Sequence, residues 1–273
     1  LYIHAMGAVD IARWDAIGKA TGQPLYKLWG GYRDSMPVIA IGGYYQDHKG
    51  LDALATEVEE YEAFGFGGLK LKVGDRSPEH DLKRLETVTS AASDDFVVAC
   101  DANQGYSIEE ALRFAKGARE HDIEWFEEPV AWHDQYAGME TVRDRTGVPV
   151  TAGQSESSAS ACRLLIESNA VDVINLDASI AGGPTQWRKV AHMAEVNNVS
   201  MAHHEEPQIS MHLLASIPNG LYVEAFDPSI DPVWYELLED RPEIRDGRIE
   251  LPDAPGVGLT IDESVVEEYA VKI

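Results

Sequence analysis

The chain is poor in cysteine and has no long apolar run. Only Cys100 and Cys162 occur among its 273 residues, which is too few for a disulfide framework and is typical of a reduced, intracellular protein. No apolar stretch approaches the roughly 18 residues that a helix needs to span a bilayer. We therefore expect a soluble, cytoplasmic protein without a membrane partner.

Basic residues are scarce as well. The 22 Lys and Arg residues are outnumbered by 47 Asp and Glu, which gives a formal net charge of −25. A field of that sign repels nucleic acid and anionic membranes, so neither is expected as a partner. The acids are spread along expected helix faces, for example at Glu57 and Glu60, which indicates a solvated acidic surface. Such an excess would fit a halophilic protein, whose surface charge is screened by salt.

The sequence does contain one repeated pattern, in which short apolar runs alternate with helix-like stretches. The apolar runs are Met36–Ile41, Phe66–Val73, Phe96–Cys100, Ile123–Phe126, Val148–Ala152, Val171–Leu176, Val199–Ala202 and Leu221–Val223. The helix-like stretches include Leu51–Ala63, Leu82–Ala92, Ile108–Glu120, Ser158–Glu167 and Thr185–Val196. Strands that alternate with helices of this length predict parallel βαβ units, and eight strands in this length of chain favour a closed α/β barrel.

The two ends of the chain depart from this repeat. Residues 4–30 predict one helix, and Val257–Ile261 predicts a loop and a small strand outside the barrel. We expect residues 1–35 to form a helix that leads into a barrel over residues 36–245. Residues 246–273 are expected to form a separate C-terminal segment, and a domain upstream of residue 1 is expected to be absent from this chain.

Polar residues follow nearly every predicted strand at the same point of the repeat, where a parallel barrel carries its active site. These residues are Lys70, Lys72, Asp101, Asn103, Glu127, Glu128, Gln154, Glu156, Asp177, His203, His204 and Glu224. Lys70 and Lys72 are two apart in a strand, so both face the barrel mouth while the flanking Leu69 and Leu71 face the helices. Crowding of the two ammonium groups is expected to lower the pKa of a lysine toward that of a usable base.

Asp101 and Glu127 end neighbouring strands, and two inward carboxylates repel one another unless a cation lies between them. Ligands that offer only oxygen suit Mg²⁺. A third ligand is expected from the fifth strand, where Gln154 stands in the expected place and Glu156 could supply a carboxylate instead. Both alternatives remain open.

His203 and His204 are adjacent, so only one of them can point inward. Asp177 on the neighbouring strand could orient that histidine as an Asp–His dyad. Such a dyad would face the lysines across the pocket. Proton removal from one side and acid catalysis from the other would then be possible.

These motifs, taken in order, resemble the mandelate racemase subgroup of the enolase superfamily. The resemblance rests on Leu-Lys-Leu-Lys at 69–72, Asp101-Ala-Asn103, Trp125-Phe-Glu127-Glu-Pro and Asn175-Leu-Asp177 followed by Gly182-Gly183. It implies a modified TIM barrel, (β/α)7β, with remnants of an α+β capping domain. It also implies Mg²⁺, abstraction of the α-proton of a carboxylate substrate, and a homo-oligomer.

The resemblance also implies roles for individual residues. Lys72 would be the base, and Lys70 would neutralise the substrate carboxylate. Asp101 and Glu127 would be metal ligands, and Glu224 would donate a hydrogen bond to the enediolate. Counting back from His212 places His204, rather than His203, on the histidine of the dyad. Asn103 and His203 are expected to bind substrate.

Where the family usually has Gly-Glu on the fifth strand, this chain has Gly153-Gln154. A sugar-acid substrate is favoured, because polar side chains suited to a polyol lie near the strand ends: Asn103, Gln104, Tyr106, His133 and Gln208. The sequence therefore predicts an acid-sugar dehydratase. One alternative is a racemase or epimerase of a 2-hydroxy acid, and another is a non-catalytic barrel that binds a carboxylate or a metal.

Overall fold

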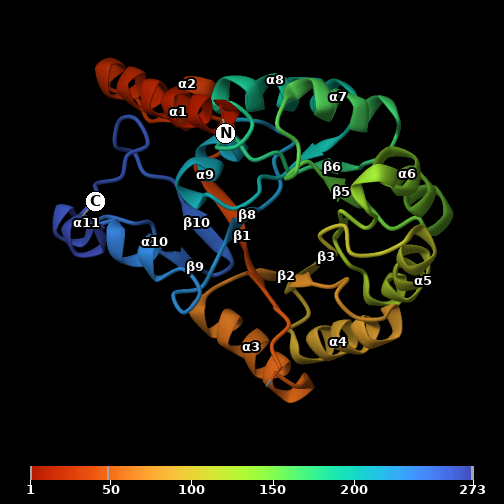
Figure 1. Cartoon of the computed structure of the whole chain (residues 1–273). Helices are drawn as coiled ribbons and strands as arrows, with labels where there is room; N and C mark the ends of the chain where they lie inside the picture. The colour runs from red at the N-terminus through yellow and green to blue at the C-terminus, as the bar shows by residue number, and fades with distance from the viewer. Residues whose placement is uncertain (1, 48, 272–273) are drawn as a thin grey trace.

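Eight parallel strands are arranged around a barrel, and a helix on the outside follows each of the first seven strands (Figure 1). The computed structural model describes residues 2–47 and 49–271. The barrel strands are β1 (Ser35–Gly42), β2 (Gly68–Lys72), β3 (Val97–Asp101), β4 (Phe126–Glu127), β5 (Val150–Ala152), β6 (Val173–Ile174), β7 (Ser200–Met201) and β8 (Val223–Ala225). The helices between them are α3 (Leu51–Phe64), α4 (Pro78–Ala91), α5 (Ile108–Ala118), α6 (Gln135–Thr146), α7 (Ala159–Glu167), α8 (Pro184–Val196) and α9 (Pro207–Ala215). The predicted (β/α)7β barrel is confirmed.

Backbone pairing closes the barrel. Each strand from β1 to β7 pairs in parallel with the next, and β1 also pairs with β8. Between β7 and β8, the Met201 N–H donates to Asn219 O and the Leu221 N–H donates to Met201 O, both at 2.8 Å. The ring therefore leaves neither β7 nor β8 as an open edge, and all eight carboxyl ends lie at one end of the barrel.

Two helix ends follow the predicted local signals. Ser107 caps α5 through a capping box with Glu110, whose side chain accepts from the Ser107 N–H. Gly65 ends α3 in the left-handed conformation, at φ 113°. The capping box marks where α5 begins, and Gly65 marks where α3 ends.

The buried side chains of the strands form two groups, because successive residues of a strand point to opposite faces. Leu69 and Leu71 of β2 are fully buried against the surrounding helices, whereas Lys70 between them faces the barrel interior. Inside the barrel, Ile39, Ala99 and Trp125 form a small separate apolar cluster. This cluster fills the barrel below the charged strand ends.

The amino-terminal region forms two helices, so the prediction of one helix over residues 4–30 is wrong. α1 (Tyr2–Thr21) ends before Gly22, and α2 (Leu25–Trp29) starts after Pro24, which disfavours a helical residue before it. α1 packs closely on the barrel at Gly7, where an added Cβ would lie 2.1 Å from Ser179 O. Within the described ranges, no helix is both long enough and apolar enough to cross a membrane.

The C-terminal region holds elements that the sequence pattern did not indicate. α10 (Pro232–Leu237) precedes a hairpin of β9 (Ile244–Arg245) and β10 (Arg248–Glu250), and β10 pairs antiparallel with β1. α11 (Glu263–Tyr269) follows. The strand predicted over Val257–Ile261 does not form, because this segment makes only a single bridge, from Ile261 to Leu238. The register of β10 on β1 ties the tail to the barrel.

Candidate active site

Lys70 lies at the centre of a buried charged cluster at the carboxyl ends of the strands. Its Nζ lies 2.6 Å from Glu224 Oε1, 3.2 Å from Glu127 Oε1 and 4.0 Å from Asp101 Oδ2. All four side chains are fully buried. Burial lowers the pKa of Lys70, but the three carboxylates outweigh it and raise that pKa above its ordinary value. Lys70 is therefore a fixed positive charge among three acids.

Lys72 lies beside this cluster and reaches solvent. Its Nζ donates to Asp101 Oδ2 at 2.6 Å and to Asn103 Oδ1 at 3.0 Å, and 12% of its side chain is exposed. The same nitrogen lies 5.7 Å from the ring centre of Tyr44. Burial and the charge of Lys70 lower the pKa of Lys72, but the Asp101 carboxylate outweighs them and raises it. The expected lowering of the pKa is thus not found, because an acid contacts the amine directly.

Asp101 and Glu127 present oxygens toward the same interior. Glu127 Oε1 accepts from Asn175 Nδ2 at 2.6 Å, and its Oε2 accepts from Trp125 Nε1 at 3.2 Å. Asp101 Oδ1 accepts from the Asn103 N–H at 2.8 Å. Burial and the negative charge of Asp101 raise the pKa of Glu127 to about 8. Two carboxylates are therefore held together at an energetic cost.

The two candidates for a third ligand lie in different surroundings. The Gln154 N–H donates to Asn175 Oδ1 at 3.1 Å, and Asn175 in turn bonds Glu127, so Gln154 belongs to the interior network. Glu156 instead accepts a hydrogen bond from Gln135 at the start of α6. Hydrogen bonds through Asn175 thus link Gln154 to Glu127, whereas Glu156 bonds a residue of α6.

The oxygens of Asp101, Glu127 and Gln154 fit Mg²⁺. Among residues 2–47 and 49–271, no three His, Cys, Asp or Glu side chains are grouped to hold a metal ion, and the amide oxygen of Gln154 could complete a set with Asp101 and Glu127. Gln154 Oε1 is buried and has no hydrogen-bond partner among the residues that the structure describes. A buried carbonyl oxygen requires a donor or a cation, and an oxygen-only set is what Mg²⁺ prefers.

His204 lies on the other side of Glu224, at the end of β7. Its Nδ1 lies 3.2 Å from Asp177 Oδ2, which is the predicted dyad geometry, and its Nε2 lies 3.4 Å from Glu205 Oε1. Burial lowers the pKa of His204, and Lys70 lowers it further. The Asp177 hydrogen bond and the charges of Glu224 and Glu205 outweigh both, so the pKa is raised above its ordinary value. The neighbouring acids thus favour the protonated imidazole more than water does for a free histidine.

His203 does not reach the pocket, in contrast to the expectation that it binds substrate. It is fully buried, with its ring centre 6.1 Å from that of Trp187. Its Nε2 accepts from the Ala178 N–H at 3.0 Å, and its Nδ1 lies 2.9 Å from His204 O. Because both ring nitrogens are used by the backbone, His203 supports the loop that carries His204.

Glu224 joins the two halves of the site. Its Oε1 pairs with Lys70, and its Oε2 accepts from the Glu205 N–H at 3.2 Å. Glu205 adopts φ 51°, which is uncommon for a residue with a side chain, and this conformation directs its N–H toward Glu224. The loop after β7 is therefore shaped to contact the carboxylate of β8.

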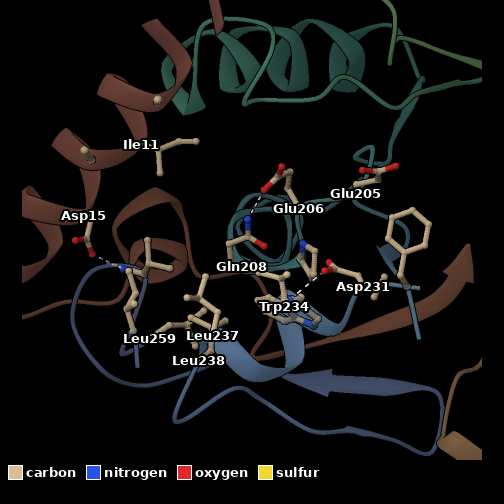
Figure 2. Close-up of a pocket in the computed structure, with 18 of the residues that line it drawn as sticks. Ile11, Asp15, Glu205, Glu206, Gln208, Asp231, Trp234, Leu237, Leu238 and Leu259 are labelled. Atoms are coloured by element: carbon tan, nitrogen blue, oxygen red, sulfur yellow. Dashed lines mark hydrogen bonds between the residues drawn. The ribbon is translucent and has the colours of Figure 1, made fainter. Parts of the chain in front are cut away.

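A cavity of about 520 Å³ opens beside Glu224. Figure 2 shows Glu205, Glu206 and Gln208 on one side of it, and Ile11 of α1 facing them from the other side. Trp234 of α10 lies across from these side chains. The lining of the cavity combines the acidic side chains of Glu205, Glu206 and Glu224 with apolar side chains, many of them from α10 and the C-terminal segment.

Sequence reasoning missed three residues of this site. Asn175, which links Gln154 to Glu127, stands two residues before Asp177 and follows an apolar run, so strand alternation could have indicated it. Glu128 is indicated by the sequence only as a polar residue after the fourth strand, and its place after Glu127 predicts a side chain on the opposite face, yet it accepts a hydrogen bond from Gln154. Glu205 directly follows His204, but adjacency alone does not predict that its carboxylate lies 3.4 Å from His204 Nε2.

Comparisons with known proteins identify the family. The model of the enolase C-terminal domain-like family matches residues 53–265. A solved mandelate racemase/muconate lactonizing enzyme from a marine actinobacterium, in complex with magnesium, is 46% identical. It superposes with a TM-score of 0.95 over 98% of this chain and 76% of that one.

Two curated relatives have names that refer to sugar acids. Arabinonate dehydratase of Saccharolobus solfataricus is 31% identical over 99% of this chain and 73% of its own length. The 3,6-anhydro-alpha-L-galactonate cycloisomerase of Streptomyces coelicolor is 32% identical over 98% of this chain and 72% of its own length. The chain belongs to the mandelate racemase/muconate lactonizing enzyme family of the enolase superfamily.

Proposed function

We propose that the protein is a magnesium-dependent hydro-lyase that removes water from a sugar acid. The observation that carries this proposal is the pair of proton-transfer groups at the mouth of one barrel, Lys72 and the Asp177–His204 dyad. β8 and β1 separate the strands that carry them. Sequence relatives whose names refer to sugar acids support the choice of substrate class.

The reaction follows from the groups on each side. Mg²⁺ on Asp101, Glu127 and Gln154 would stabilise the negative charge that develops on the substrate carboxylate. Asp101 favours the ammonium form of Lys72, so Lys72 has to release that proton before it takes the α-proton. Its side chain is partly exposed and can exchange a proton with solvent, whereas Lys70 is fully buried. The imidazolium of His204 donates its proton to the β-hydroxyl, which leaves as water. The enol product then tautomerises to a 2-keto-3-deoxy acid.

His204 also separates dehydration from racemisation. A racemase needs a base on each face of the α-carbon, so its histidine has to begin one half-reaction without a proton. Here Asp177 and Glu205 flank the two ring nitrogens of His204 and favour its protonated form. Racemisation or epimerisation of a 2-hydroxy acid is the second candidate, because Lys72 and His204 together could perform it.

The test uses the chain with Mg²⁺ and a panel of sugar acids in D₂O at high salt, and follows both keto-acid formation and α-proton exchange. We expect His204→Asn to abolish the keto acid but to retain α-exchange, and Lys72→Ala to abolish both. His192→Asn, at an exposed histidine of α8, is the matched control and should behave as wild type. Formation of a C2 epimer without loss of water would instead show the racemase.

A non-catalytic barrel is the remaining alternative, because Gln154 lacks the charge of a carboxylate ligand. Calorimetric titration with Mg²⁺ separates this case from the catalytic one. If wild type does not bind Mg²⁺ while Gln154→Glu does, the catalytic proposal fails. Binding by wild type would show that the amide is an adequate third ligand.

We also propose a compartment, a salt dependence and an oligomeric state for the protein. Both cysteines are buried free thiols, which suits a reducing cytoplasm. The charge of −25 suits a halophilic protein, and activity is expected to rise with salt. We also expect a homo-oligomer, which sedimentation would test.

A further inference from the structure

Gln154 is held by two hydrogen bonds, neither of which involves the oxygen of its side-chain amide. The backbone N–H donates to Asn175 Oδ1 at 3.1 Å, and Nε2 donates to Glu128 Oε2 at 3.1 Å. Oε1 is buried and accepts no hydrogen bond from the described part of the chain. The side chain therefore has one satisfied end and one unsatisfied end.

The carboxylate of Glu128 determines the orientation of the Gln154 side-chain amide. An ionised carboxylate only accepts hydrogen bonds, whereas an amide has one donating end and one accepting end. With Glu128 on one side, the NH₂ group of Gln154 has to face it, since the reverse orientation would bring two acceptor oxygens together. The oxygen of Gln154 must then point to the other side.

Glu128 is itself firmly held. Its backbone N–H donates to Thr151 O at 2.9 Å, and its carbonyl accepts from the Gln104 N–H at 2.8 Å. The side chain is 3% exposed and also accepts from Gln104 Nε2 at 3.1 Å. Its φ of 37° lies in the left-handed region, where a non-glycine residue is retained only if its surroundings fix it.

We propose that Glu128 is a positioning residue that presents the Gln154 amide oxygen to the divalent cation shared with Asp101 and Glu127. This inference rests on the magnesium site of the proposed function. The negative charge behind the NH₂ group also polarises the amide toward its oxygen. The Gln154 amide is neutral, but the negative charge of Glu128 lies directly behind it. Glu128 thus supplies part of the negative charge that a glutamate at position 154 would bring to the cation.

A carboxylate at position 154 would need no such orientation, since both of its ends are oxygens. The inference therefore predicts that the effect of Glu128 depends on the residue at 154. This dependence can be measured as a double-mutant cycle on Mg²⁺ affinity. The readout is the calorimetric Kd for Mg²⁺ alone, without substrate.

We expect Glu128→Gln to weaken Mg²⁺ binding about 10- to 100-fold, the usual cost of losing a partner that orients a metal ligand. In the Gln154→Glu background, the same change should alter the Kd less than about threefold. Glu124→Gln is the matched control, because Glu124 is a half-buried glutamate before β4, at the other end of the barrel. It makes the same change in net charge and should leave the Kd unchanged.

Three outcomes of the Mg²⁺ titrations would contradict the positioning role of Glu128. If wild type binds no Mg²⁺, the proposed function fails and the inference fails with it. If wild type binds but Glu128→Gln binds equally well, or weakens binding equally in both backgrounds, only the positioning role is overturned. Thermal melts verify that each variant folds, and Glu128→Asp, which withdraws the acceptor by one methylene, replaces Glu128→Gln if that variant does not fold.

Discussion

His212 is a buried histidine that should make the stability of the fold depend on pH. It lies on α9, where its Nδ1 accepts from the Tyr26 N–H of α2 at 3.3 Å and its Nε2 lies 2.9 Å from Val257 O in the C-terminal segment. Val257 also lines the cavity beside Glu224. Burial lowers the pKa of His212 from 6.5 to about 4, although the Val257 carbonyl opposes this. The neutral ring therefore holds three elements together.

The sign and size of the effect follow from that pKa. The folded-state pKa of His212 is below the unfolded value, so between pH 6.5 and 4 the unfolded chain binds a proton that the folded chain refuses. The stabilisation is complete above pH 6.5 and is lost as the pH falls. Each pH unit costs about 1.4 kcal/mol, which gives a loss of about 2 kcal/mol at pH 5.

The assay compares urea unfolding of wild type and His212→Gln at pH 7 and pH 5 in the same salt. Glutamine offers a donor and an acceptor but does not titrate. The variant should lose about 2 kcal/mol less than wild type between the two pH values, because all other groups contribute equally to both proteins. Equal losses in the two proteins would refute the buried neutral state of His212.

Three further predictions concern the site and its scaffold. Asp177→Asn removes the carboxylate that raises the pKa of His204, so the alkaline limb of the kcat/KM profile should move to lower pH. A profile that keeps its alkaline limb would contradict the role of the dyad. Mg²⁺ at about 100 times its Kd should raise the free energy of unfolding by about 2.7 kcal/mol, and EDTA should reverse the gain in a thermal melt. Ser107→Ala removes the α5 capping box and should lower stability by about 1 kcal/mol without changing Mg²⁺ affinity.

Much of the barrel could be predicted because strand ends carry a local signal. In β2, Lys70 and Lys72 alternate with Leu69 and Leu71, and this alternation alone places the charges inward. The β9–β10 hairpin gives no comparable signal, because Ile244 and Ile249 are its only buried apolar side chains. Its position depends on pairing with β1, about 200 residues away in sequence, which no local pattern encodes.

The candidate site could also be predicted only in part from the sequence. Strand alternation indicates that Asp101 and Glu127 face one interior, but Gln154 and Glu156 follow the end of β5, where alternation no longer applies. Contacts from elsewhere decide between them. Gln135 at the start of α6 holds Glu156 away from the interior, and Asn175 after β6 holds Gln154 within it. Both partners come from other elements, so the choice is a tertiary one.

The charge balance of the buried cluster explains why a cation belongs to this design. When all three are ionised, Asp101, Glu127 and Glu224 carry three negative charges against the two positive charges of Lys70 and Lys72, and the negative charges beside Glu127 help to raise its pKa. A substrate carboxylate would therefore meet a net negative site, and in a poorly solvated interior such repulsion is strong. A divalent cation changes the sum to a net positive one. The same ion that stabilises charge during the reaction is thus needed for an anionic substrate to enter, so the metal should bind before the sugar acid.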